Sequence, residues 1–385
     1  MGKAGAHVWQ ADELLADRYD VLKCLRKTAT GCLYRVEDVF RGSHQLILGP
    51  GLRVLQTEGG LKWFQGYAQR TLGVSPHANV LVPRRLDQHE GVPFLVMPDA
   101  EGTFWDVAIE EAYLTELPHM VDIALQVARG LAWLHEENRV HYNVKPANVI
   151  LTESDVVKLW KYGEVEAVSR VYASPEQIRG EQSLGNATDT WSWAASVLHM
   201  FVGRVVWKSG LKVPTVMGRY VRHGPAREGL PLMPGRMADL LRECLQKNPA
   251  ARPEEMQHVV SELEAILKDL RGEETQAPPA EPLEDEWKAF EELVDQPDIA
   301  DQLARDIGGA ANEATEAEDE PEDEIIEVIE DEETGPAEDA EPQQPQQTED
   351  AQDAEEDEES PEESTGSSAE ERGRSGTRRW HFEQR

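Results

Sequence analysis

The residues with the clearest chemical potential lie in two short stretches near the middle of the chain. His141 has a side chain that could act as a general base, and Lys145 and Asn148 follow it closely. Lys161, a little further on, could neutralise a phosphate group directly, without a metal ion. These residue types suit proton transfer and phosphate binding. The surrounding sequence shows whether the other residues that such chemistry needs are also present.

These residues belong to several motifs that occur in a defined order. The order and spacing resemble those of the protein kinase family, most closely its bacterial Ser/Thr branch, over roughly residues 19 to 270. The resemblance implies an α+β, two-lobed protein-kinase-like fold, with a small β-rich lobe and a larger helical lobe. The motifs are Trp133–Leu151, Val157–Gly163, Ala173–Gly180, Asp189–Ser192 and Pro249–Pro253.

The resemblance allows the catalytic loop to be checked residue by residue. The family's His-Arg-Asp triplet reads His141-Tyr142-Asn143, and the neutral Asn143 cannot accept the proton of a substrate hydroxyl. At this position in kinases the histidine is a packing residue, which is how we interpret His141. Lys145 and Asn148 match the phosphate-contacting lysine and the metal-binding asparagine, so we expect the loop scaffold to persist.

The metal-binding Asp-Phe-Gly motif is also altered, because it reads Lys161-Tyr162-Gly163. Magnesium needs hard anionic oxygen ligands, and an ammonium group in place of a carboxylate changes the local charge by about two units. On family geometry the nearest carboxylates, Glu153 and Asp155, point away from the site. We therefore predict no metal site, although Lys161 could instead neutralise a phosphate or fill the space of a missing lysine.

The glycine-rich loop that covers ATP should occupy Arg26–Cys32. Arg26 and Thr28 stand at the first two glycine positions, where side chains oppose close approach of the backbone to phosphates. Gly31 alone remains, and we interpret it as a turn residue. Lys27 could reach phosphates from this loop, as a relocated lysine does in the with-no-lysine kinases, but we predict a solvated loop charge.

The ion pair that positions the ATP phosphates lacks both members. Gly49 stands at the predicted position of the third-strand lysine, and no lysine occurs between Lys27 and Lys62. The partner glutamate is missing too, since residues 59–86 include no acidic residue. The lysine–glutamate pair is therefore missing, in addition to the catalytic aspartate and the metal-binding aspartate.

Residues that maintain the architecture are kept, in contrast to the catalytic ones. Glu176 and Arg252 match a buried ion pair of the family, and Asp189 matches the aspartate that braces the catalytic loop. Only ten residues separate Gly163 from Ser174, about half the length of an ordinary activation segment. We therefore expect the fold to persist without a peptide-docking platform.

The elements that carry these motifs follow from apolar patterning. Apolar residues at helical spacing predict helices through Met120–Leu134 and Met256–Leu270, and the stretch Leu61–Leu72 can form a third. Short runs rich in β-forming residues predict strands at Tyr19–Leu25, Cys32–Val36, Leu46–Leu48 and Phe94–Met97.

Charge divides the chain into domains. The first 271 of the 385 residues carry 31 Lys and Arg against 33 Asp and Glu, whereas the remainder carries 7 against 41. A segment with as much charge as the last 114 residues cannot bury enough apolar surface to fold. We predict an N-terminal extension over 1–18, a kinase-like domain over 19–271 (lobes 19–97 and 103–271), and a largely disordered acidic tail over 272–385, with short helices within 284–307.

Composition also limits the setting in which the protein acts. Cys24, Cys32 and Cys244 fit neither a disulfide framework nor a metal site, so we predict a reducing compartment. We find no signal peptide and no membrane-spanning run, and therefore predict a cytoplasmic protein that does not engage membranes. The net charge of −36 argues against nucleic-acid binding.

The pattern predicts a pseudokinase that acts as a scaffold or regulator through protein partners. No cofactor is expected, and weak, metal-independent ATP binding through Lys27, Gly31, Lys145 and Asn148 is the most that we predict. One alternative is a divergent Ser/Thr kinase that uses Lys27, Lys161 and Asn148 in unusual roles. The other makes the 272–385 tail a binding module for a basic partner, or else a solubilising spacer.

Overall fold

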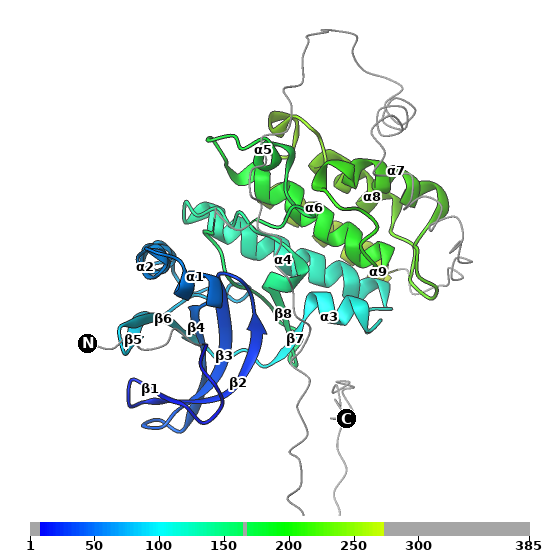
Figure 1. The fold of residues 1–385 in the computed structure, drawn as a ribbon. Helices are drawn as coiled ribbons and strands as arrows, with labels where there is room; N and C mark the ends of the chain where they lie inside the picture. The colour runs from blue at the N-terminus through cyan, green and yellow to red at the C-terminus, as the bar shows by residue number, and fades with distance from the viewer. Residues whose placement is uncertain (1–7, 165–167, 273–385) are drawn as a thin grey trace, which may run out of the picture. The chain divides into compact units, whose positions relative to one another are not determined.

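The computed structural model describes residues 8–164 and 168–272, which form a β-rich lobe and a helical lobe (Figure 1). The predicted tail and its helices at 284–307 lie outside the described residues, apart from Gly272. Within the described ranges, no helix combines the length and apolarity needed to cross a bilayer.

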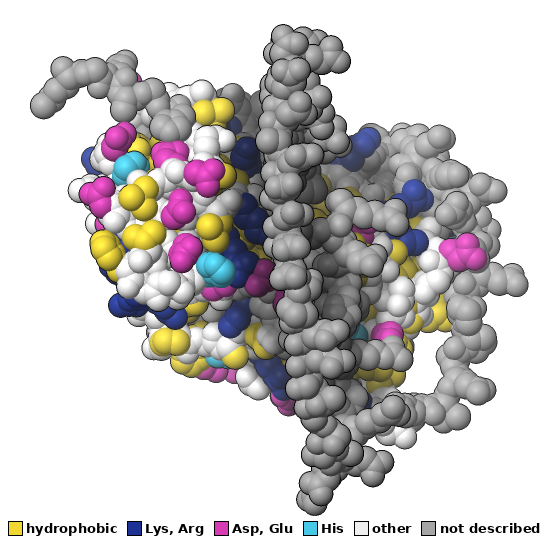
Figure 2. Space-filling model, turned by 90° about the horizontal axis from the view of Figure 1, so that it is seen from below, with side chains coloured by type: hydrophobic (Ala, Val, Ile, Leu, Met, Phe, Trp, Pro, Cys, Tyr) yellow, Lys and Arg dark blue, Asp and Glu magenta, His cyan; other side chains and the backbone are white. Residues whose placement is uncertain are grey.

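The small lobe contains an antiparallel sheet with strand order β1-β2-β3-β4-β6-β5, and two helices lie between β4 and β5 in the sequence. Seen from below, this lobe carries acidic, basic and hydrophobic side chains intermixed (Figure 2). Its elements are β1 (Leu14–Leu15), β2 (Tyr19–Lys27), β3 (Gly31–Asp38), β4 (Ser43–Pro50), α1 (Leu52–Gln56), α2 (Gly60–Thr71), β5 (Arg85–His89) and β6 (Val92–Pro98).

The two faces of this sheet bury different residues, as the alternation of side chains along a strand requires. On one face, Leu33, Leu46 and Leu48 pack together with Phe64 of α2. The other face is covered by Trp9, which lies in one cluster with Tyr34, Ile47 and Phe94. The strands at the centre of the sheet are thus buried on both sides, which explains the apolar runs Leu46–Leu48 of β4 and Phe94–Met97 of β6.

Residues 8–18 are part of this lobe. We predicted an extension over 1–18, but the indole of Trp9 lies 5.4 Å from the Tyr34 ring and 5.6 Å from the Phe94 ring. Leu14 and Leu15 also pair with β2. Residues 8–18 therefore belong to the lobe, because one face of its sheet needs this cover.

The large lobe is built around helices α4, α6 and α9. A second sheet, β7-β8-β9, lies where the two lobes meet, and short 3₁₀ helices join several elements. Its elements are β7 (Gly102–Phe104), α3 (Trp105–Glu110), α4 (Leu117–Glu136), η1 (Pro146–Asn148), β8 (Val149–Thr152), β9 (Val157–Leu159), α5 (Pro175–Ile178), α6 (Asn186–Val202), η2 (Gly210–Lys212), α7 (Val213–His223), α8 (Gly235–Cys244), η3 (Pro249–Ala251) and α9 (Met256–Gly272).

The two predicted apolar stripes are confirmed, because they face each other where α4 packs against α9. Helix α6 has no polar face of its own, since every residue from Thr188 to Val202 is buried. A helix that is buried all round forms the centre of a core. The predicted strands and the helix at 61–72 are also confirmed, within β2, β3, β4, β6 and α2.

Candidate functional site

The loop between α4 and η1 is held by a buried carboxylate. Asp189, at the start of α6, accepts hydrogen bonds from the backbone N–H groups of His141 (2.7 Å) and Tyr142 (2.8 Å). Its Oδ2 atom also lies 2.9 Å from His135 Nε2. Tyr142 has a φ of +65°, a strained conformation that these bonds maintain. The frame of a catalytic loop is therefore present.

The side chains of this loop are turned into the protein. His141 is fully buried, and burial lowers its pKa, so it is a neutral packing residue that no solvent-borne substrate can reach. Asn143 is 2% exposed and donates to a carboxylate oxygen of Glu164 at 3.4 Å. Asn148 donates to the backbone carbonyl of Asn143 at 2.8 Å, and Lys145 is buried as well. No proton acceptor for a hydroxyl stands at position 143.

A buried ion pair occupies the position that the metal-binding aspartate would take. The ammonium of Lys161 lies 3.2 Å from the carboxylate of Glu164, and both side chains are at most 2% exposed. Lys161 also donates a hydrogen bond of 2.9 Å to Thr28 Oγ1, which belongs to the loop between β2 and β3. The loop that should cover phosphates is thus bound directly to the lysine.

Glu164 was missed in the sequence analysis, which identified Glu153 and Asp155 as the nearest carboxylates. Those two residues are exposed in the turn between β8 and β9, as predicted. The sequence does contain one indication of this contact, because Glu164 carries the opposite charge and follows Lys161 by three residues. Glu164 also helps to raise the pKa of the Tyr67 phenol, after the larger effect of burial, so Tyr67 of α2 lies close to the pair.

The β2–β3 loop uses its own backbone groups internally. Thr28 Oγ1 donates to the Gly31 carbonyl at 2.8 Å and accepts from the Gly31 N–H at 3.0 Å. A Cβ atom added at Gly51 would lie 2.5 Å from the carbonyl oxygens of Thr28 and Ala29, so the loop rests on the end of β4. Lys27 is exposed. These amides therefore do not form an open phosphate cradle.

A second contact joins the small lobe to the large lobe. The guanidinium of Arg26 forms two 2.8 Å hydrogen bonds to Asp106 of α3 and lies 4.0 Å from the centre of the Phe104 ring. Phe104 in turn lies 6.1 Å from Trp160, and both rings belong to one cluster with Ile150. Arg26, which stands at the first glycine position, thus connects the two lobes.

The predicted position of the missing lysine needs a correction of one residue. A lysine that contacts phosphates must point toward the large lobe, and on β4 that face carries Leu46 and Leu48, which cluster with Trp160. A Cβ atom at Gly49 would instead clash with the ring of Trp9 on the opposite face. Strand alternation therefore places Leu48, not Gly49, at the lysine position.

Further into the large lobe, an ion pair joins the end of the activation segment to η3. Arg252 donates to both carboxylate oxygens of Glu176, at 2.7 and 2.9 Å, and both residues are buried. The guanidinium of Arg252 also lies 4.9 Å from the centre of the Trp191 ring. Bidentate geometry and stacking make this a structural anchor.

These residues do not fit a magnesium ion. Lys161 stands where the family has a metal-binding carboxylate, and its ammonium would repel a cation. Among the described residues, no group of three His, Cys, Asp or Glu side chains is arranged to hold a metal ion. The contact of Lys161 with Thr28 and that of Arg26 with Asp106 stabilise the two lobes against each other.

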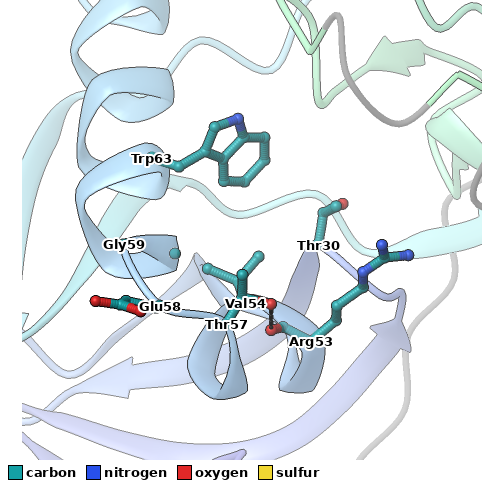
Figure 3. Close-up of a pocket in the computed structure, with 8 residues that line it drawn as sticks. Thr30, Arg53, Val54, Thr57, Glu58, Gly59 and Trp63 are labelled. Carbon is teal, nitrogen blue, oxygen red and sulfur yellow. Dashed lines mark hydrogen bonds between the residues drawn. The ribbon is translucent and has the colours of Figure 1, made fainter. Parts of the chain in front are cut away.

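A separate pocket lies beside the β2–β3 loop, against α1 and α2 (Figure 3). Its volume is about 240 Å³, smaller than the ~300–1,000 Å³ of ordinary ligand pockets. Trp63 stacks on Tyr67 at a ring distance of 5.9 Å. The pocket shares no residue with the Lys161 cluster. It is lined by Thr30, Arg53, Val54, Thr57, Glu58, Gly59, Gly60 and Trp63.

Comparison with known proteins identifies the family. The family model described as "Protein kinase domain" matches residues 71–263, which is half of the chain. The chain belongs to the protein kinase family. Family membership accounts for the loop that Asp189 holds and for the buried pair of Glu176 and Arg252. It also means that Asn143, Lys161 and Leu48 depart from the family pattern.

Relatives of this chain include bacterial enzymes. It is 23% identical over 276 residues to a probable serine/threonine-protein kinase, CPE1738, of Clostridium perfringens, covering 67% of this chain but 39% of the relative. It is 28% identical over 299 residues to serine/threonine-protein kinase PknL of Mycobacterium bovis, covering 72% and 73%. The chain thus spans about two fifths of the length of the clostridial relatives.

A solved structure with the same fold is the PknI kinase domain of Mycobacterium tuberculosis. The TM-score is 0.52 at 19% identity, and the alignment covers 67% of this chain and 99% of that one. At this level of identity the likeness shows the kinase fold.

Proposed function

We propose that this chain is a pseudokinase, a member of the protein kinase family that does not transfer phosphate and acts as a scaffold or regulator for protein partners. The observation that carries the proposal is the buried contact of Lys161 with Glu164 and Thr28. In an active kinase this space holds a metal-bound phosphate under a mobile loop. Here a protein side chain provides the positive charge and fixes the loop.

Two further features support the proposal. Asn143 removes the carboxylate that would accept the substrate proton, and Leu48 replaces the third-strand lysine with an apolar side chain that packs with Phe64 and Tyr67 of α2. Because each change removes a different catalytic part, restoring any single residue leaves the others missing. Nucleotide binding, if it occurs at all, should be weak and independent of magnesium.

The proposal is tested by phosphoryl transfer. The full chain, incubated with labelled ATP, magnesium or manganese and basic protein substrates, should show no incorporation above that of a buffer control. A bacterial Ser/Thr kinase in the same assay provides the positive control. Robust autophosphorylation that disappears in the Asn148→Ala variant would show a divergent kinase and refute the proposal.

A further inference from the structure

Helix α7 and the segments that flank it lack acidic residues. From Thr190 to Arg227 the chain has six Lys and Arg residues and no Asp or Glu. Since residues 1–271 are nearly neutral as a whole, this local excess of positive charge stands out from the intermixed charges of the small lobe.

Several cations of this stretch lie on α7 or just before it in the chain. The helix buries Val213, Val216, Met217 and Tyr220, so its 3.6-residue period turns Arg222 outward and leaves Arg219 at the edge of the buried side. Lys208 and Lys212 lie just before the helix; Lys208 and Arg222 are exposed, and Lys212 and Arg219 are partly so.

Aliphatic side chains are exposed on the same segments, with 39–44% of their surface in contact with solvent. We call the whole set the α7 face. It consists of Arg204, Val205, Lys208, Leu211, Lys212, Arg219, Val221 and Arg222. A surface that is both basic and aliphatic suits a ligand that is both acidic and aliphatic.

Residues 316–333 of this chain have that composition. They include twelve Asp and Glu and no Lys or Arg. At their centre, four aliphatic residues lie between glutamates in the run Glu324–Glu330. The run 289–304 also combines acidic and aliphatic residues but has five Asp and Glu, and the acidic run 349–363 has no Val, Ile or Leu.

The connection along the chain is compatible with this segment. Helix α9 ends at Gly272, α9 packs on α8, and α8 packs on α7, so the tail starts one helix away from the α7 face. A random coil of 43 residues, the number between Gly272 and the segment, has a root-mean-square length of roughly 35 Å. Tethering of this kind gives effective concentrations of ~1 mM.

We propose that the α7 face binds the acidic, aliphatic segment 316–333 of the same chain. The interaction covers the basic surface of the large lobe. It does not depend on whether the chain transfers phosphate, so its failure and that of the proposed function are separate results.

The first test measures hydrogen exchange of α7 in the full chain. Replacing the twelve acids of 316–333 by Gln and Asn should accelerate exchange of the α7 amides about tenfold, as expected for a Kd of ~0.1 mM at ~1 mM effective concentration. The matched control neutralises the ten acids of 349–363 and should leave α7 unchanged. Equal exchange in all three chains, or equal acceleration in the control, would overturn the proposal.

The second test addresses the surface directly. A fluorescent peptide of residues 316–333 is titrated with the full chain whose own segment is neutralised. Replacing Lys208, Lys212 and Arg222 together by Gln should weaken binding at least tenfold, and binding should weaken as salt rises. The matched control replaces Lys23, Arg53 and Lys62, which are exposed cations of the small lobe, and should bind normally. Equal affinity of the two variants would refute the α7 face as the site.

Discussion

The Arg252→Ala variant should lose about 3–5 kcal/mol of unfolding free energy, because it leaves the buried carboxylate of Glu176 without its partner. That is a large part of the ~5–15 kcal/mol by which a typical domain is stable. The measurement is urea unfolding followed by tryptophan fluorescence. Arg252→Lys, which keeps the charge but not the bidentate geometry, should lose less and serves if the alanine variant does not fold.

A surface arginine provides the control for this prediction. Arg129 forms a 2.8 Å ion pair with Glu264, but both side chains are more than 40% exposed. Its replacement by alanine should change the unfolding free energy by less than ~1 kcal/mol. If Arg252→Ala and Arg129→Ala were equally mild, the anchor would not hold the large lobe together.

The second large effect concerns the pair that replaces the metal. Lys161→Met leaves Glu164 as an unpaired buried anion, and Glu164→Gln leaves Lys161 as an unpaired buried cation, so each single variant should lose about 3–5 kcal/mol. The double variant removes both charges and should lie within ~1 kcal/mol of the native chain. Urea unfolding of the four proteins measures this cycle. If the double variant lost as much unfolding free energy as the two single variants together, the two charges would not stabilise each other.

The sequence predicted those parts of the fold that depend on local patterning. The stripes of α4 and α9 repeat at helical spacing, and the strands of the small lobe are runs of β-forming residues bounded by turns. The strands β1, β7 and β9 have two or three residues each, too few for a pattern. Such strands form because tertiary structure places them beside a partner. Trp9 was missed for the same reason, since its role depends on the sheet that it covers.

The residue types of the candidate site could be read from the sequence, but the contacts between those residues could not. From the sequence we named Asn143 and Lys161 as altered positions, but the contact of Lys161 with Thr28 joins residues 133 positions apart. The bridge from Arg26 to Asp106 spans 80 positions. The Gly49 prediction shows the sensitivity of strands to register, because a shift of one residue exchanges the two faces.

The most direct test of the account is a thermal melt of the full chain with millimolar ATP, with and without magnesium. A ligand at 100 times its Kd stabilises the folded state by ~2.7 kcal/mol, which is readily seen as a rise in Tm. Because Lys161 occupies the metal position and is bound to Thr28 of the β2–β3 loop, we predict the same Tm with ATP and magnesium as with buffer. A rise of several degrees that requires magnesium would contradict it.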